Sequence, residues 1–170
     1  MAETKIYFSD EVDRRLRERA MKRFGYGRGS ISNAVEEAVS QWLLREGVIQ
    51  SKLELIVERA KKDKDIIAVL LFGSYARKEP EYRDVDIALV LKDGKKSEEK
   101  IFDYYKAIGS SEAKIVDIVA FNTLPLEMRR RILNGATLLY SPDSGALYDK
   151  SIDTIRAWGE YSYMFNSMLQ

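Results

Sequence analysis

Three apolar runs in the centre of the chain have the length and composition of buried strands. Residues 66–72 are seven consecutive apolar residues, a run too short to cross a membrane and typical of a strand buried on both faces. Residues 87–91 form a second run of this kind, and residues 114–121 form a third that carries Asp117 in its middle. The pattern predicts the central strands of a sheet.

Apolar residues at helical spacing surround these strands, and proline and glycine mark where the helices begin and stop. The fold class that follows is α/β (α+β), with a mixed sheet and a C-terminal helix. The elements predicted here are helices at residues 53–64, 97–109, 125–135 and 146–169 and a brief strand at residues 137–140.

Two of these helices carry side chains with more than one interpretation. The arginines at residues 129–131 are interpreted as a solvated helix face rather than as a substrate clamp. The apolar set of the last helix is typical of a core or a subunit contact, although Tyr161, Tyr163 and Phe165 have an alternative role in lining one side of a cleft. That set is Leu147, Ile152, Ile155, Trp158, Tyr161, Phe165 and Met168.

The N-terminal part of the chain has a different pattern. Residues 4–9 alternate in polarity, as a short amphipathic strand does. A glycine-rich stretch at residues 25–29 then separates two helices, the second of which starts near residues 30–32. Gly47 is expected to end this module, and residues 48–52 are expected to form a short connector. The predicted domains are residues 1–47 and residues 48–170.

A lone six-residue strand cannot bury its apolar face or satisfy its edges, so we expect it to pair with the same strand of a second copy. The strand–helix–turn–helix order resembles the ribbon-helix-helix family of dimeric DNA-binding modules. The resemblance implies a homodimer in which Lys5 and Tyr7 contact bases in the major groove. It also implies that the start of the second helix, with Ser30 and Ser32, lies against a phosphate.

Local positive charge is consistent with this resemblance. From Arg14 to Arg28 the chain carries seven basic residues and one acidic residue, a net charge of +6 that suits a DNA backbone. The alternative is a module that only dimerises, with its arginines on a solvated helix face. The glycines at residues 25–29 do not follow a strand, which favours a plain interhelical turn over a phosphate-binding loop.

Composition narrows the chemistry. The 170-residue chain is 45% hydrophobic and has a net charge of +1, so any attraction to nucleic acid has to be local. It contains no cysteine, which excludes disulfides and thiolate zinc sites and leads us to expect a cytoplasmic protein. It contains no histidine, so proton abstraction falls to a carboxylate or to solvent. No apolar run is long enough for a membrane helix, and we expect no membrane partner.

A pair of acids precedes the second predicted strand. Asp84 and Asp86 are two residues apart, so their side chains are expected to project from the same face of the strand. Two neighbouring carboxylates at the start of an apolar strand repel each other and lose hydration, so we expect a cation to compensate their charge. Oxygen ligands suit Mg²⁺ or Mn²⁺. The alternative is a solvated strand start in which these acids pair with Arg83 and Arg77.

The first predicted strand ends at Gly73 and Ser74, where a turn opens a short helix and presents backbone N–H groups to a phosphate. Ser74 adds a hydroxyl donor, while Arg77 and Lys78 add positive charge for a polyphosphate. Phosphates beside a carboxylate-bound metal favour phosphoryl or nucleotidyl transfer.

This Gly-Ser turn, followed after about ten residues by the Asp84–Asp86 pair, resembles the signature of the minimal nucleotidyltransferases of the DNA polymerase β superfamily. The resemblance covers residues 53–140. The family has a third carboxylate on a later strand, for which Asp117 is the candidate; alternatively, Asp117 is a solitary exposed acid. Two residues depart from the family pattern: Lys78 replaces a common glycine, and Arg83 replaces a common serine. They bear on substrate preference rather than on the fold.

The resemblance implies metal-dependent transfer of a nucleoside monophosphate from a nucleoside triphosphate, by default ATP, to an acceptor hydroxyl. Asp84 and Asp86 would hold the metal that carries the triphosphate, and Asp86 with Asp117 would hold a second metal. The turn at Gly73 would bind the terminal phosphates, and Arg77 would offset charge as pyrophosphate leaves.

Small members of this superfamily are often antitoxins, and some of them transfer AMP onto a toxin. The resemblance therefore implies a toxin-like partner protein. A rival interpretation is a DNA-binding regulator or antitoxin whose transferase domain serves mainly as an interaction surface.

Overall fold

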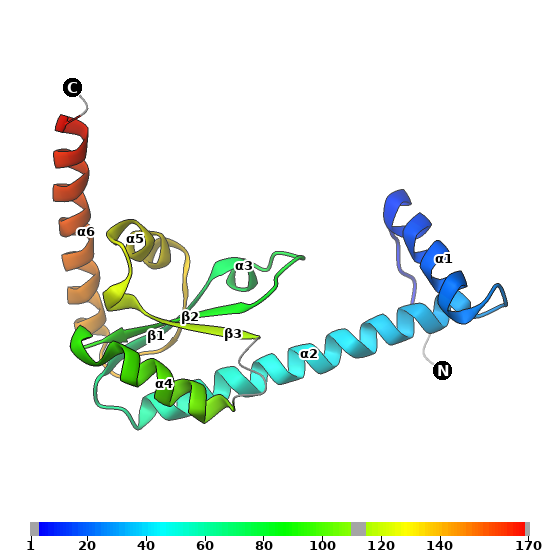
Figure 1. The fold of residues 1–170 in the computed structure, drawn as a ribbon, viewed down its shortest axis with the longest axis horizontal. Coiled ribbons are helices and arrows are strands. Elements are labelled where there is room, and N and C mark those ends of the chain that lie inside the picture. Colours follow the sequence, from blue (N-terminus) through cyan, green and yellow to red (C-terminus); the bar gives the residue numbers. More distant parts are fainter. Residues whose placement is uncertain (1–3, 110–114, 169–170) are drawn as a thin grey trace. The chain divides into compact units, whose positions relative to one another are not determined.

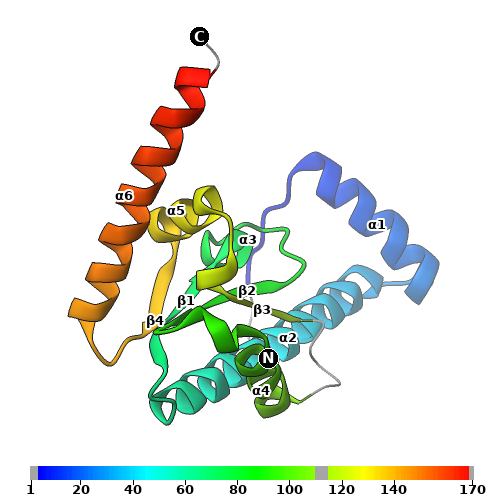
Figure 2. The same cartoon turned by 60° about the vertical axis from the view of Figure 1, so that its left-hand side comes forward.

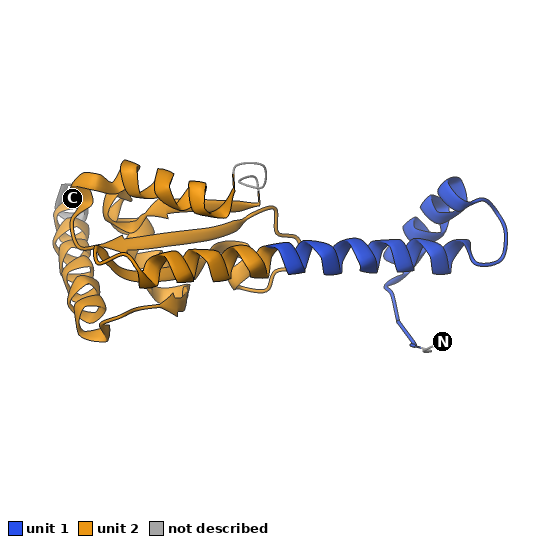
Figure 3. Cartoon of the chain, turned by 90° about the horizontal axis from the view of Figure 1, so that it is seen from below, with its two compact units in different colours: residues 1–48 blue, residues 49–170 orange. Residues whose placement is uncertain are grey.

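The computed structural model describes residues 4–109 and 115–168, with side chains described up to residue 164. The chain divides into two compact units, Met1–Val48 and Ile49–Gln170, which Figure 3 shows in blue and orange. The first residue of the predicted strand at residues 114–121 lies outside the described residues. Each unit is described by itself below.

A four-stranded mixed sheet forms the centre of the second unit, with the order β3-β2-β1-β4. The strands β1 and β2 are antiparallel, β1 and β4 are antiparallel, and β2 and β3 are parallel. This sheet confirms the predicted α/β class and the predicted strands, although β3 is shorter than expected because the chain turns into a 3-10 helix at Phe121–Thr123. The strands are β1 (Ile66–Phe72), β2 (Val85–Leu91), β3 (Val116–Ala120) and β4 (Thr137–Tyr140).

Helices cover both faces of the sheet (Figures 1 and 2). The C-terminal part of α2 (Ser30–Lys61) and α4 (Ser97–Ile108) pack on one face, where Ile56 and Tyr104 are fully buried. The other face is covered by α5 (Leu126–Gly135) and the start of α6 (Ser144–Met168), around Phe121 and Ile132. Both central strands are buried on both faces, as their continuous apolar runs predict.

The helix α2 corrects one prediction. Residues 48–52 are not a connector, because α2 continues through them without a break to Lys61. Gly47 weakens a helix by only about 1 kcal/mol, whereas the apolar residues of α2 that follow it, from Ile49 to Ala60, form one buried stripe. Ile49, which the connector prediction left out of the core, is fully buried with Leu53 and Ile56. Packing of this stripe therefore outweighs the cost of the glycine.

The first unit contains α1 (Asp10–Phe24) and the N-terminal part of α2. Residues 4–9, which the pattern predicts as a strand, have no regular secondary structure and pair with no strand in the single chain that the structure describes. Ala20 is the one apolar residue from 4 to 48 that is buried, so a single copy of this unit has almost no core. Its large exposed apolar side chains are Ile6, Tyr7, Phe8, Val12, Tyr26, Val39, Trp42, Leu43 and Leu44.

The apolar set predicted for α6 is only partly covered. Leu147 packs against the sheet, but Ile155 and Tyr161 are about half exposed. The side chains of Phe165 and Met168 lie outside the described part of the chain. Among the helices as far as they are described, none is long and apolar enough to cross a membrane.

Candidate active site

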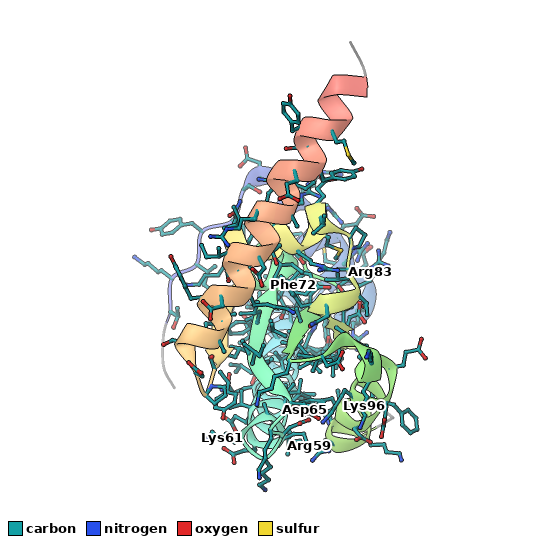
Figure 4. All side chains as sticks on the ribbon, turned by 90° about the vertical axis from the view of Figure 1, so that its left-hand side faces the viewer. Arg59, Lys61, Asp65, Phe72, Arg83 and Lys96 are labelled. Atoms are coloured by element: carbon teal, nitrogen blue, oxygen red, sulfur yellow. The ribbon has the colours of Figure 1, made fainter. Side chains whose placement is uncertain are left out.

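The candidate site begins where β1 ends. Phe72 is followed by α3 (Gly73–Ala76), a single helical turn, as the sequence predicts. Gly73 has a φ of +79°, and a β-carbon added to it would lie 1.8 Å from Oδ2 of Asp86. Glycine is therefore required at this position both by the backbone conformation and by the carboxylate that lies against it. Figure 4 shows Phe72 and Arg83 away from Lys61 and Asp65, which lie near the opposite end of β1.

The sheet brings the predicted acids together at this end. Asp86 on β2 is paired in register with Phe72 on one side and with Asp117 of the parallel strand β3 on the other. Residues paired in this way project from the same face of a sheet. Asp84 comes just before β2, two residues from Asp86, and is partly buried. Asp86 thus lies against the turn at Gly73, with Asp117 beside it on β3 and Asp84 two residues before it.

Asp86 is the acid with the most perturbed environment. Burial raises its pKa, and the charges of Asp84 and Asp117 raise it further, whereas the charge of Arg77 lowers it. Asp84 and Asp117 are therefore close enough to Asp86 for their charges to raise its pKa. In the described part of the chain, no basic side chain forms an ion pair with any of these three acids. The alternative in which Arg77 pairs with Asp84 or Asp86 is therefore not what the structure shows. Arg77 pairs instead with Glu79 at 2.6 Å.

Asp117 is exposed and has its own hydrogen-bond partner. The hydroxyl of Tyr105 on α4 donates to Oδ1 of Asp117 at 3.1 Å and accepts from the backbone N–H of Ile118 at 2.9 Å. Tyr105 therefore covers the outer edge of β3 and orients the third acid. No local pattern in the sequence marks Tyr105, because its contact with Asp117 forms only when α4 packs beside β3.

The donor set suits a hard divalent cation, with one restriction. Within the described ranges, no three acidic side chains are grouped closely enough to hold a metal by themselves. Mg²⁺ is commonly held by one or two carboxylates together with substrate phosphates, so a pair of acids is sufficient on the protein side. The raised pKa of Asp86 fits a carboxylate whose ionised form lacks a positive partner. Asp84 with Asp86 therefore fits such a metal, and Asp86 with Asp117 fits a second.

The predicted phosphate-binding residues lie on α3 and just after it. Ser74 is partly buried, and its hydroxyl forms no hydrogen bond with another described residue. The first N–H groups of α3 have no acceptor within the helix. Arg77 is exposed and uses Nε for its bond to Glu79. Lys78 has a φ of +58°, a left-handed conformation that explains why the family commonly has glycine there.

A pocket of about 400 Å³ opens beside this turn. Gly73 and Arg77 form one side of it, and residues of α5 form the other. The pocket is lined by Phe72, Gly73, Arg77, Met128, Arg131, Ile132 and Gly135. The sequence interpretation of residues 129–131 as one solvated face is confirmed for Arg131, which is exposed even though it lines this pocket, and is wrong for Arg129 and Arg130, which are partly buried.

The residues predicted to contact DNA lie in the first unit and have different surroundings. Lys5 and Tyr7 are exposed, as are Arg28 and Ser32. Arg14 pairs with Glu11 at 2.8 Å. The hydroxyl of the buried Ser30 donates to carbonyl groups of the glycine-rich turn, so this side chain closes the turn between the helices.

Several of the other basic residues of this unit are also engaged locally. Arg17 pairs with Asp13 and Lys22 with Glu18, both one helical turn apart, which reduces the charge that α1 presents. Arg15 and Arg19 form no ion pair with a described residue and line the same shallow hollow as Val12 and Leu16.

Comparison with known proteins decides the family. The family model described as polymerase beta, nucleotidyltransferase matches residues 54–145, which is more than half of the chain and includes all three acids and the turn at Gly73. The chain belongs to this nucleotidyltransferase family. Its candidate metal-binding acids therefore occupy the family's own fold, and the first unit lies outside the matched region. No curated protein matches the chain.

Solved structures share the fold of this nucleotidyltransferase. A toxin–antitoxin with AMP-PNP contains a chain with a TM-score of 0.54 and 15% identity, covering 70% of this chain and 94% of that one. A variant of the toxin–antitoxin MntA-HpeT has a TM-score of 0.52 and 13% identity, and the match covers 74% of this chain and 94% of that one. A third structure is the tri-AMPylated Shewanella oneidensis HEPN toxin in complex with MNT antitoxin. It has a TM-score of 0.50 and 15% identity, and the match covers 76% of this chain and 95% of that one. At these identities the likeness establishes a common fold.

Proposed function

We propose that this chain is an active nucleotidyltransferase that moves a nucleoside monophosphate from a nucleoside triphosphate, by default ATP, to an acceptor hydroxyl. The observation that carries the proposal is the contact between Asp86 and Gly73. It joins the carboxylate cluster to the turn that would bind the phosphates. Membership of the nucleotidyltransferase family supports the same chemistry.

In this reaction the acceptor oxygen attacks the α-phosphorus, the bond to the β-phosphate breaks, and pyrophosphate leaves with the electron pair. Asp84 and Asp86 would hold a Mg²⁺ or Mn²⁺ ion, and Asp86 with Asp117 a second, which when bound neutralise phosphate charge and lower the pKa of the acceptor hydroxyl. The acceptor proton passes to a carboxylate or to solvent, because the chain contains no histidine. Arg77 offsets charge on the departing pyrophosphate.

The proposed acceptor is a hydroxyl group of a partner protein. Two observations support this choice: the structural neighbours are toxin–antitoxin assemblies, and one of them contains a tri-AMPylated toxin. Each of the three acids is at least partly accessible, which is compatible with a macromolecular acceptor. The rival function, a regulator whose transferase domain serves only as an interaction surface, predicts the same partner without any transfer.

The test is transfer of label from ATP to a candidate partner, such as the protein encoded beside this chain. We expect the partner to acquire label from α-labelled ATP, but none from γ-labelled ATP, and only with Mg²⁺ or Mn²⁺. Asp84→Asn should abolish the labelling, whereas Asp149→Asn on α6, away from the acids, should not. A partner that binds the wild-type chain but takes up no label favours the rival function.

For the first unit we propose dimerisation and DNA binding in the manner of a ribbon-helix-helix module. The observation that favours this is the near absence of a core in one copy: Tyr7, Trp42 and Leu44 are all more than half exposed. A second copy would bury these side chains and pair residues 4–9 of the two copies. Arg15, Arg19 and Arg28, which lack ion pairs among the described residues, would contribute to the DNA-binding surface.

These two proposals have separate measurements. Sedimentation of the full chain should show a dimer, and Trp42→Glu should produce monomers while Tyr148→Glu on α6 should not. Mobility shifts with duplex DNA should weaken steeply with salt and with Arg15→Ala and Arg19→Ala together. A dimer that binds no DNA at low salt would leave dimerisation as the role of the unit.

A further inference from the structure

The pocket beside α3 differs in charge from two other hollows in the described part of the second unit. Its lining contains two arginines, Arg77 and Arg131, and no acidic residue. The hollow around Lys64 and Lys92 also contains acidic residues, as does the one around Lys100. A pocket lined by two guanidinium groups and no carboxylate has the charge of an anion-binding site.

The three consecutive arginines of α5 have three different environments. Arg129 donates to the backbone carbonyls of Leu124 at 2.7 Å and Asn122 at 2.5 Å, so it holds the start of the helix. Arg130 lies over the ring of Trp158 at 5.0 Å and packs α5 against α6. Both are committed to the fold.

Arg131 has no such structural commitment. It is exposed, and it forms no hydrogen bond or ion pair with another described residue. It shares its helix face with the other α5 residues of the pocket, at the spacing of three, four and seven residues that one face of a helix requires. Those residues are Met128, Ile132 and Gly135. This spacing was visible in the sequence but could be read only once the pocket was known.

We infer that Arg131 binds the outer phosphates of the nucleoside triphosphate, together with Arg77 on the facing side of the pocket. The inference rests on the proposed function and names a further substrate-binding residue for it. A triphosphate carries up to four negative charges. Arg77 and the metal ions do not balance them locally, because the acids that hold the ions offset part of the ions' positive charge. The Nε of Arg77 is bound to Glu79, which leaves its terminal amino groups for a phosphate.

The position of Gly73 supports a polyphosphate rather than another anion. Gly73 lines the pocket and also lies against the carboxylate of Asp86, so this one residue is shared by the pocket and the candidate metal-binding acids. A chain of phosphates held at its inner end by the acids would extend its outer phosphates past Gly73 toward both arginines. The volume of about 400 Å³ is of the size used for nucleotide-sized ligands.

The test measures binding of a non-hydrolysable ATP analogue and of AMP to the full chain by calorimetry in Mg²⁺. We expect Arg131→Ala to weaken binding of the triphosphate analogue roughly 10–100-fold, because charge-assisted hydrogen bonds are lost, and to leave AMP binding unchanged. Arg131→Lys should recover part of the affinity. Arg156→Ala, which removes an exposed arginine of α6 outside the pocket, should have no effect.

A second variant tests the pocket without removing charge. No described atom lies within 4 Å of a β-carbon built on Gly135, so Gly135→Leu is expected to fold and to narrow the pocket. This variant should weaken binding of the triphosphate analogue more than binding of AMP. Inorganic tripolyphosphate should compete with the analogue for wild type and much less for Arg131→Ala.

The outcomes separate this inference from the proposed function. Wild-type transfer with equal triphosphate affinity in wild type and Arg131→Ala overturns the role of Arg131 and leaves the transferase intact. Tripolyphosphate binding that depends on Arg131, in a chain that transfers no label, supports the anion pocket and overturns the transferase. If Arg131→Ala weakens only the binding of the partner, the pocket holds an acidic protein segment and the inference fails. If wild type binds neither the analogue nor tripolyphosphate, it fails as well.

Discussion

The carboxylate of Asp86 lies against the α-carbon of Gly73, and no side chain fits between them. This contact links the end of β1 to the start of β2, although the two residues are separated by a turn and a loop. It explains why a glycine with a left-handed backbone follows a strand that is buried along almost its whole length. It also makes the position of the acid depend on the position of the turn.

The first prediction concerns this contact. Gly73→Ala should lower the free energy of unfolding by about 2–5 kcal/mol, because it adds backbone strain and a clash with Asp86. Gly109→Ala is the matched control, since Gly109 has a φ of +82° and only an ordinary contact at 3.8 Å. That variant should lose about 1–2 kcal/mol. Urea unfolding measures both, and equal losses would show that the clash is relieved without cost.

The second prediction concerns pH. The pKa of Asp86 is raised above its ordinary value of 3.8 by burial and by its acidic neighbours, so the folded state loses stability as pH rises through that raised pKa. Asp86→Asn should therefore stabilise the chain at neutral pH, with the gain disappearing below pH 3.8.

Asp65 provides a control of opposite sign. Its hydrogen bond with Lys100 lowers its pKa, so it stabilises the fold above its ordinary value of 3.8 and loses that effect as pH falls through the lowered pKa. Asp65→Asn should therefore destabilise the chain at neutral pH. Thermal unfolding in metal-free buffer from pH 3 to pH 8 measures both variants. A stabilising Asp65→Asn or a destabilising Asp86→Asn at neutral pH contradicts the assignment.

The third prediction concerns Lys78. Its φ of +58° costs a side-chain-bearing residue more than it costs glycine, even after the larger unfolded-state entropy of glycine is counted. Lys78→Gly should raise the free energy of unfolding by about 0.5–1 kcal/mol. Lys96→Gly, where φ is −106°, should lower it instead. Chemical denaturation of the two variants decides, and a loss of stability in Lys78→Gly would refute the argument from backbone strain.

The fourth prediction concerns Tyr105. Tyr105→Phe removes the acceptor for the backbone N–H of Ile118 and the donor to Asp117, which should destabilise the chain by about 1 kcal/mol. The amide hydrogen of Ile118 should exchange faster, and nucleotidyl transfer should slow because Asp117 is less well oriented. Tyr148→Phe, on an exposed part of α6, should change neither property. Unaltered exchange at Ile118 would mean that Tyr105 does not protect this edge of the sheet.

The sequence predicted most of the second unit because its signals are local. The apolar runs at residues 66–72 and 87–91 can be strands buried on both faces and little else, and Pro125 and Gly135 delimit α5 closely. Gly47 predicts a break in α2, but its cost to the helix is small beside the packing of the buried stripe that starts at Ile49.

The candidate site was predictable only in part, for a related reason. The spacing between the turn at Gly73 and the Asp84–Asp86 pair is one that the family shares, so the sequence alone predicts these residues. The roles of Tyr105 and Arg131 depend on how α4 and α5 pack against the sheet, which no local pattern specifies. The three neighbouring arginines look equivalent in the sequence and differ only in what lies opposite each of them.

The central claim is that Asp84, Asp86 and Asp117 hold a metal–nucleotide complex next to Gly73. Its most direct test is a Mn²⁺ titration of the full chain by electron paramagnetic resonance, with and without a non-hydrolysable ATP analogue. We predict that wild type binds Mn²⁺ more tightly when the analogue is present, and that Asp86→Asn loses this enhancement while Asp149→Asn keeps it. Equal Mn²⁺ binding by wild type and Asp86→Asn in the presence of the analogue would contradict the account.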